Sequence, residues 1–123
     1  MKKKLSKRYK KLIEASANKK AETLDEGIQN IIVASQKDYE EWSGGRYDTD
    51  DYSVEEGRSY IKIIRGSSVH SFVVKKETVR NNRVFKVGDI LKPASWRAPA
   101  LNVARGNVFE EGSPMNWTGP LYL

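Results

Sequence analysis

Few side chains in this 123-residue sequence are suited to catalysis. Cysteine is absent and His70 is the single histidine, which excludes thiolate nucleophiles, disulfides and clusters of His and Cys ligands. Ser68 and Ser71 lie nearby, but neighbours in a strand alternate between faces, so His70 and Ser71 are expected to point apart. Neither a Gly-x-Ser-x-Gly elbow nor a Gly-rich phosphate loop is present. We therefore expect His70 to be a structural strand residue with one hydrogen bond, and the protein not to be an enzyme.

Aspartates gather in the segment 44–57, where Asp48, Asp50 and Asp51 lie within four residues. Carboxylate oxygens can hold Ca²⁺ or Mg²⁺. The spacing does not match an EF-hand loop, because no glycine stands at its sixth position. We predict a solvated acidic loop over 44–57, with no metal and no cofactor.

The stretch 92–99 combines cations, an indole ring and prolines. It places Trp96 between Lys92 and Arg97, and the prolines stiffen the chain around them. Cations neutralise phosphates, and an exposed ring can stack on a base. In the alternative interpretation Trp96 plugs one end of a sheet, because large aromatic residues in small domains are mostly buried. Arg97 and Arg105 would then remain on the rim, where they can still contact phosphate.

The net charge of +6 divides into blocks of opposite sign. Residues 1–20 carry +8 and residues 58–109 carry +9. Residues 21–57 carry −9, and residues 110–123 carry −2. This asymmetry is typical of a protein that binds a polyanion, and equally of blocks that neutralise each other within the chain.

Two helices are predicted in the N-terminal part. Residues 5–17 have an apolar stripe opposite a lysine-rich face, which can lie on nucleic acid or remain solvated over a packed helix. Residues 24–43 follow a capping box, Thr23 to Glu26, and end at Gly44. The isoleucine-rich middle of this second segment is also compatible with a short strand.

Residues 58–123 are rich in strand signals. A hairpin is predicted from 59–65 and 69–74, followed by a loop over 75–83 with a turn at Asn81-Asn82. Short strands are expected at 84–86, 90–92 and 116–118, and an ordered loop with room for one helical turn at 94–109. The predicted fold is a single α+β domain, 1–123. Its N-terminal helices (1–43) pack on a small curled antiparallel β-sheet or partial barrel (58–123), and the acidic loop joins the two parts.

Several stretches of the C-terminal half resemble a family of small proteins of tailed bacteriophages. The resemblance covers about residues 57–120, and its most specific parts are Ala94-Ser95-Trp96-Arg97-Ala98-Pro99-Ala100 and Ala104-Arg105-Gly106-Asn107. It implies a phage protein acting in the host bacterial cytoplasm, and it assigns no role to any residue. The basic start is not followed by an apolar core, and no apolar run reaches about 20 residues, so a soluble protein without a signal peptide is expected.

The leading hypothesis is a small basic protein, not an enzyme, that binds DNA or RNA through backbone charge. The residues expected to contact nucleic acid are Lys7, Arg8, Lys10, Lys11, Lys92, Trp96, Arg97 and Arg105. The alternative is an interaction module for a host or virion protein, with the acidic segment 38–56 as one surface. No membrane partner is expected, and the sequence leaves the oligomeric state open.

Overall fold

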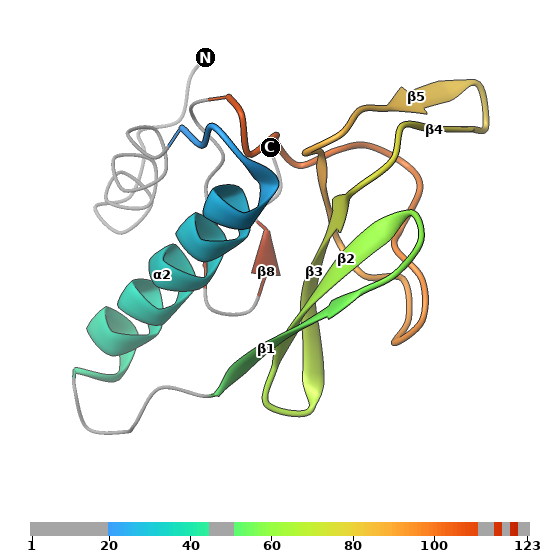
Figure 1. Ribbon diagram of the computed structural model, residues 1–123. Helices are drawn as coiled ribbons and strands as arrows, with labels where there is room; N and C mark the ends of the chain where they lie inside the picture. Colours follow the sequence, from blue (N-terminus) through green and yellow to red (C-terminus); the bar gives the residue numbers. More distant parts are fainter. Residues whose placement is uncertain (1–19, 45–50, 111–114, 117–118, 121–123) are drawn as a thin grey trace, which may run out of the picture.

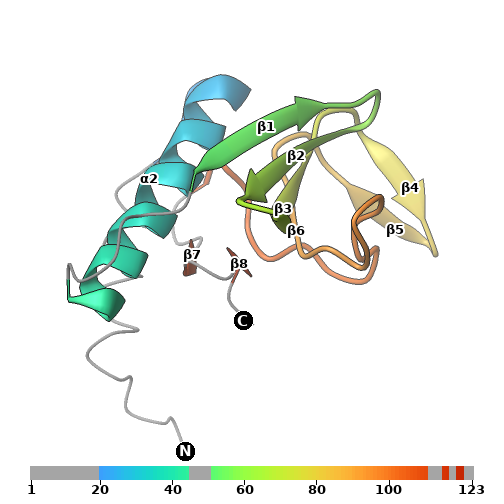
Figure 2. The same ribbon diagram turned by 90° about the horizontal axis from the view of Figure 1, so that it is seen from below.

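The computed structural model describes residues 20–44, 51–110, 115–116 and 119–120. Helix α2 (Leu24–Ser43) lies along one side of a small antiparallel sheet, and a β-hairpin extends at the end away from the helix (Figure 1). The view from below shows the same arrangement (Figure 2). This is the predicted α+β fold, but the sheet is open and does not close into a barrel. The predicted helix over 5–17 lies outside the described residues.

Helix α2 begins and ends where its capping signals predict. The Glu26 amide donates to Thr23 Oγ1 at 3.1 Å, and Gly44 has a φ of 65°, so its amide can turn back to Glu40 O. Ile28, Ile31 and Ile32 are buried on the face toward the sheet. The segment is helical throughout, so the compatible short strand is not formed.

The main sheet has four strands in the order β1-β2-β3-β6. The predicted hairpin is confirmed as β2 (Tyr60–Arg65) and β3 (Ser68–Val74), and β6 (Ile90–Leu91) pairs with β3. The prediction of a loop over all of 44–57 is wrong, because β1 (Tyr52–Glu56) pairs with β2 along its whole length. The sequence of β1 is polar and gives no apolar strand pattern. Its Glu55 pairs with Lys62 of β2, and its Glu56 pairs with Lys75, which follows β3.

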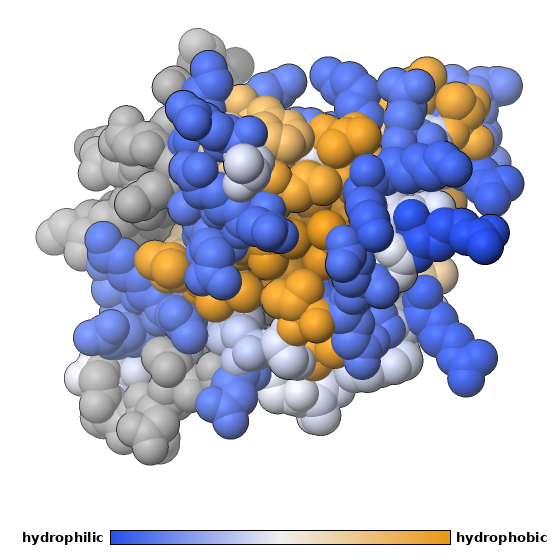
Figure 3. Space-filling view, viewed as in Figure 1, coloured by the Kyte–Doolittle hydropathy of each residue, from blue (hydrophilic) through white to orange (hydrophobic). Residues whose placement is uncertain are grey.

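Each face of the sheet carries its own hydrophobic cluster. Ile61, Ile63 and Val73 pack toward α2, and hydrophobic atoms fill the seam between helix and sheet (Figure 3). On the other face Phe72, Val74 and Leu91 pack with Phe85 and, from the chain after β6, with Leu101 and Ala104. The segment after β6 therefore covers the face that α2 leaves open.

A β-bulge corrects the expectation that His70 and Ser71 point apart. Ile63 pairs with Ser71 and Ile64 pairs with Val69, so His70 is an extra residue in β3 and the alternation of faces is interrupted there. Both side chains are buried, and His70 Nδ1 lies 2.9 Å from Ser71 Oγ. The expectation of a structural His70 with a hydrogen bond is thus supported, although by a geometry that a regular strand does not have.

The smaller strands differ in part from the predictions. The turn at Asn81-Asn82 joins β4 (Thr78–Arg80) to β5 (Arg83–Phe85), so part of the predicted loop 75–83 is a strand. Residues 94–109 contain no helical turn. Of the predicted strand 116–118, Asn116 belongs to β7 (Met115–Asn116), which pairs with β8 (Gly119–Pro120), and residues 117–118 lie outside the described residues. No described helix is long and apolar enough to cross a membrane.

Candidate nucleic-acid interface

The loop after β6 holds Trp96 in a fixed frame. An isolated bridge joins Pro93 to Pro99, and the Ala100 amide donates to Lys92 O at 2.7 Å. Inside this frame, Ser95 Oγ accepts from the Arg97 amide at 3.3 Å and from the Ala98 amide at 3.2 Å. The backbone polar groups of the loop form hydrogen bonds within the loop itself. They need no contact from its larger side chains, which can therefore face outward.

Trp96 is exposed and does not plug the sheet. Its exposed fraction is 47%, and Lys62 Nζ lies 4.6 Å from the centroid of the indole ring. This distance is within the range of a cation–π contact, which orients the ring and places positive charge against it. Behind Lys62, the rings of Tyr60 and Phe72 meet edge to face at 6.3 Å. The outer face of the sheet thus carries an exposed indole ring with a cation against it. Trp96 and Lys62 together are called the aromatic platform.

A cleft of about 230 Å³ lies beside this platform. Arg97 lines one part of it, and Arg58, Tyr60 and Lys62 line the part formed by the start of β2. Glu55 also lines the cleft, and its carboxylate lies 3.5 Å from Lys62 Nζ. Glu56 lines it as well, so the cleft has mixed charge, with Arg58 and Arg97 as its exposed cations.

The expected contact residues are only partly brought together. Lys92 and Arg97 lie on the same framed loop as Trp96, with Lys92 half-buried and Arg97 exposed. Arg105 is not on the rim as expected: it is 9% exposed, because its amide donates to Ile90 O at 2.7 Å and draws this segment against β6. Lys7, Arg8, Lys10 and Lys11 lie outside the described residues.

The sequence analysis missed Lys62, whose side chain is only 13% exposed because it lies against the Trp96 ring and is paired with Glu55. Tyr60 and Lys62 are two positions apart in a strand, which places a ring and a cation on the same face. That spacing was a usable signal, but nothing in the sequence brings Trp96 over the same face.

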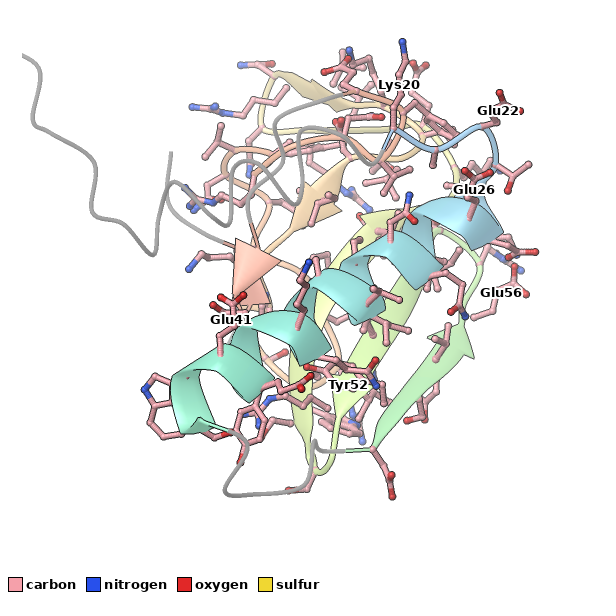
Figure 4. All side chains as sticks on the ribbon, turned by 90° about the vertical axis from the view of Figure 1, so that its left-hand side faces the viewer. Lys20, Glu22, Glu26, Glu41, Tyr52 and Glu56 are labelled. Atoms are coloured by element: carbon pink, nitrogen blue, oxygen red, sulfur yellow. The ribbon has the colours of Figure 1, made fainter. Side chains whose placement is uncertain are left out.

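Part of the acidic block neutralises cations within the chain, as one of the two interpretations of the charge blocks predicts. Glu55 pairs with Lys62, and Glu56 lies 3.0 Å from Lys75 Nζ, so β1 neutralises cations of the β-rich half. Other acidic residues lie exposed on or beside α2, among them Glu22, Glu26 and Glu41 (Figure 4). The described acidic residues therefore concentrate at α2 and β1, and Glu55 and Glu56 of β1 line the cleft beside the Trp96 loop.

The buried polar residues between α2 and the sheet form a separate group. Tyr52 points from β1 toward α2 (Figure 4), and its hydroxyl is hydrogen-bonded to Ser35 Oγ. The Tyr52 ring also meets the His70 ring edge-on at 6.2 Å. His70 is 1% exposed. These residues stabilise the contact between helix and sheet.

Metal ligands are not grouped in the described part of the chain, where no cluster of three or more His, Asp or Glu side chains is found. Asp48 and Asp50 lie outside the described residues, and Asp51 is exposed.

Fold and surface together define a small α+β protein with an exposed indole ring on its outer sheet face, beside a cleft of mixed charge. The chain belongs to a family of unknown function (DUF7717), whose model matches residues 2–123. No curated protein and no solved structure matches the chain.

Proposed function

We propose that this protein binds nucleic acid through the outer face of its sheet. The observation that carries the proposal is the exposed Trp96 ring with Lys62 on it, held in a framed loop that also carries Lys92 and Arg97. Every base has a π-face that can stack on an indole ring, and neighbouring cations can contact the adjoining phosphates. Such a site recognises the polymer with little dependence on its sequence. The resemblance to small phage proteins supports a role in an infected bacterial cell.

Trp96→Ala is expected to weaken binding to single-stranded oligonucleotides by about tenfold, because base–aromatic stacking contributes about 1–3 kcal/mol per base. Fluorescence anisotropy with a labelled single strand measures this effect in the full chain. Val103→Ala is the matched control, since Val103 is also exposed and also lies in the segment after β6. Equal affinities of the two variants and the unmodified protein would remove Trp96 from the interface.

A second candidate function is binding to a protein partner through β1. This strand is at the edge of the sheet, and Val54 is 44% exposed on it. An exposed edge can pair with an extended segment of another chain, and Glu55 and Glu56 favour a basic segment. A pull-down from bacterial lysate distinguishes the two functions, because a protein partner survives nuclease treatment whereas a complex held by nucleic acid does not.

A further inference from the structure

The hairpin of β4 and β5 is the feature that the proposed interface leaves unused. It extends at the end of the molecule away from α2 (Figure 1 and Figure 2). Val79 and Val84 lie directly opposite each other and are 62% and 58% exposed. Hydrophobic atoms are visible over this hairpin in the space-filling view (Figure 3). The two valines stabilise the hairpin as a cross-strand pair and leave it projecting and exposed at this end of the molecule.

The charges on the hairpin indicate which kind of molecule it contacts. Arg80 lies directly opposite Arg83, next to the turn, and both are exposed. Like charges at directly opposed positions destabilise a strand pair. No ion pair to either arginine is recorded within the described residues. Lys76, at the base of the hairpin, is exposed as well. An anion held between the arginines would relieve their repulsion, so the pair favours a polyanionic partner over an apolar one.

The hairpin is also held in one shape. Asn81 and Asn82 have φ angles of 52° and 62°, the left-handed conformation that a tight two-residue turn of type I′ requires. At the other end Phe85 is 2% exposed in the hydrophobic cluster of the outer face. Because turn and base are both fixed, little conformational entropy is lost when the hairpin binds.

We propose that the β4–β5 hairpin enters the major groove of duplex DNA. This inference rests on the proposed nucleic-acid binding and adds a duplex contact to it, separate from the Trp96 loop, whose ring stacks on unpaired bases. A two-stranded ribbon fits this groove, which is about 12 Å wide and about 8.5 Å deep. Three residues per strand extend about 10 Å, which matches the depth. Arg80 and Arg83 contact phosphates or guanine edges, and the asparagines of the turn can reach adenine. The major groove of an RNA duplex is too deep and narrow for this contact.

The test compares two double variants of the full chain. Arg80→Gln with Arg83→Gln removes the cations of the hairpin. Lys37→Gln with Lys75→Gln removes the same charge from an exposed position on α2 and from Lys75, which is paired with Glu56. Anisotropy is measured with a duplex DNA of about 20 base pairs, the corresponding RNA duplex and a single strand. The arginine variant is expected to bind duplex DNA at least about tenfold more weakly, with a salt slope lowered by about 2, and the lysine variant to change little.

The outcomes separate the two proposals. If the unmodified protein binds no nucleic acid probe, the proposed function is wrong. If it binds, but the arginine and lysine variants have equal affinity for duplex DNA, only the hairpin inference is overturned. A preference of the unmodified protein for the RNA duplex would overturn it too. Thermal unfolding confirms that the arginine variant folds, which is expected because the substitution removes a repulsion.

Discussion

Between about 50 and about 200 mM salt, the affinity of this protein for nucleic acid is expected to fall about 500-fold. The logarithm of the binding constant decreases by about 0.9 per contacted phosphate for each unit of log salt, so about five phosphates account for such a loss. Arg80, Arg83 and Arg97 are exposed in the described part of the chain, and segment 1–20 carries +8. Anisotropy titrations at several salt concentrations measure the slope.

Two variants assign this slope to particular side chains. Arg97→Gln is expected to lower it by about 1, because one phosphate contact is lost. Trp96→Ala weakens binding but leaves the slope unchanged, because stacking releases no counterions. Unfolding curves at both salt concentrations show that the protein stays folded. A slope near zero would contradict binding through backbone charge and would favour the interaction module.

Gly27→Ala is expected to destabilise the protein by about 2 kcal/mol. The helix propensity of alanine alone would instead stabilise it by about 1 kcal/mol. A Cβ at Gly27 would lie 2.5 Å from Val108 Cβ and 2.6 Å from Val108 Cγ2. Both neighbours are buried, so neither the helix nor the segment after β6 can move without loss of packing. Denaturant unfolding followed by circular dichroism measures the change.

The sign of this effect is the decisive result. Gln29→Ala is the control, because Gln29 is exposed in the first half of the same helix and its replacement is expected to change stability by less than about 0.5 kcal/mol. In a Val108→Gly background the effect of Gly27→Ala should shrink, as in any pair that is coupled by contact. A stabilised Gly27→Ala variant would show that α2 does not pack this closely.

Local signals predicted the elements that depend on local interactions. The capping residues of α2 and the β-branched residues of β2 and β3 favour these conformations locally, and both elements are confirmed. Strand β1 was missed because its stability comes from pairing with β2 rather than from an apolar pattern, as its mostly exposed residues show. The bulge at His70 depends on the register of two strands, which no single strand encodes.

The candidate interface was predictable in type but not in place. The sequence of residues 92–99 shows a ring and cations together, but the exposure of Trp96 follows from the bridge between Pro93 and Pro99 and from Lys62, which lies far away in the chain. Arg105 was wrongly placed on the rim for the same reason, because its burial results from long-range pairing with β6. The Asn81-Asn82 turn was recognised, whereas the short strands on either side of it were only partly predicted.

The contact of the helix start with residue 108 also determines when the protein can fold during synthesis. The Ala21 amide donates to Val108 O at 2.9 Å, and the Val108 amide donates to Gly88 O at 2.9 Å. Val108 thus joins the chain just before α2 to the turn before β6. Contacts between residues so far apart in sequence form late, because a long loop must close first. We expect the apolar side of α2 to pack first on β2 and β3 in a ribosome-bound chain, and the start of the helix to be fixed only after residue 108 has left the exit tunnel.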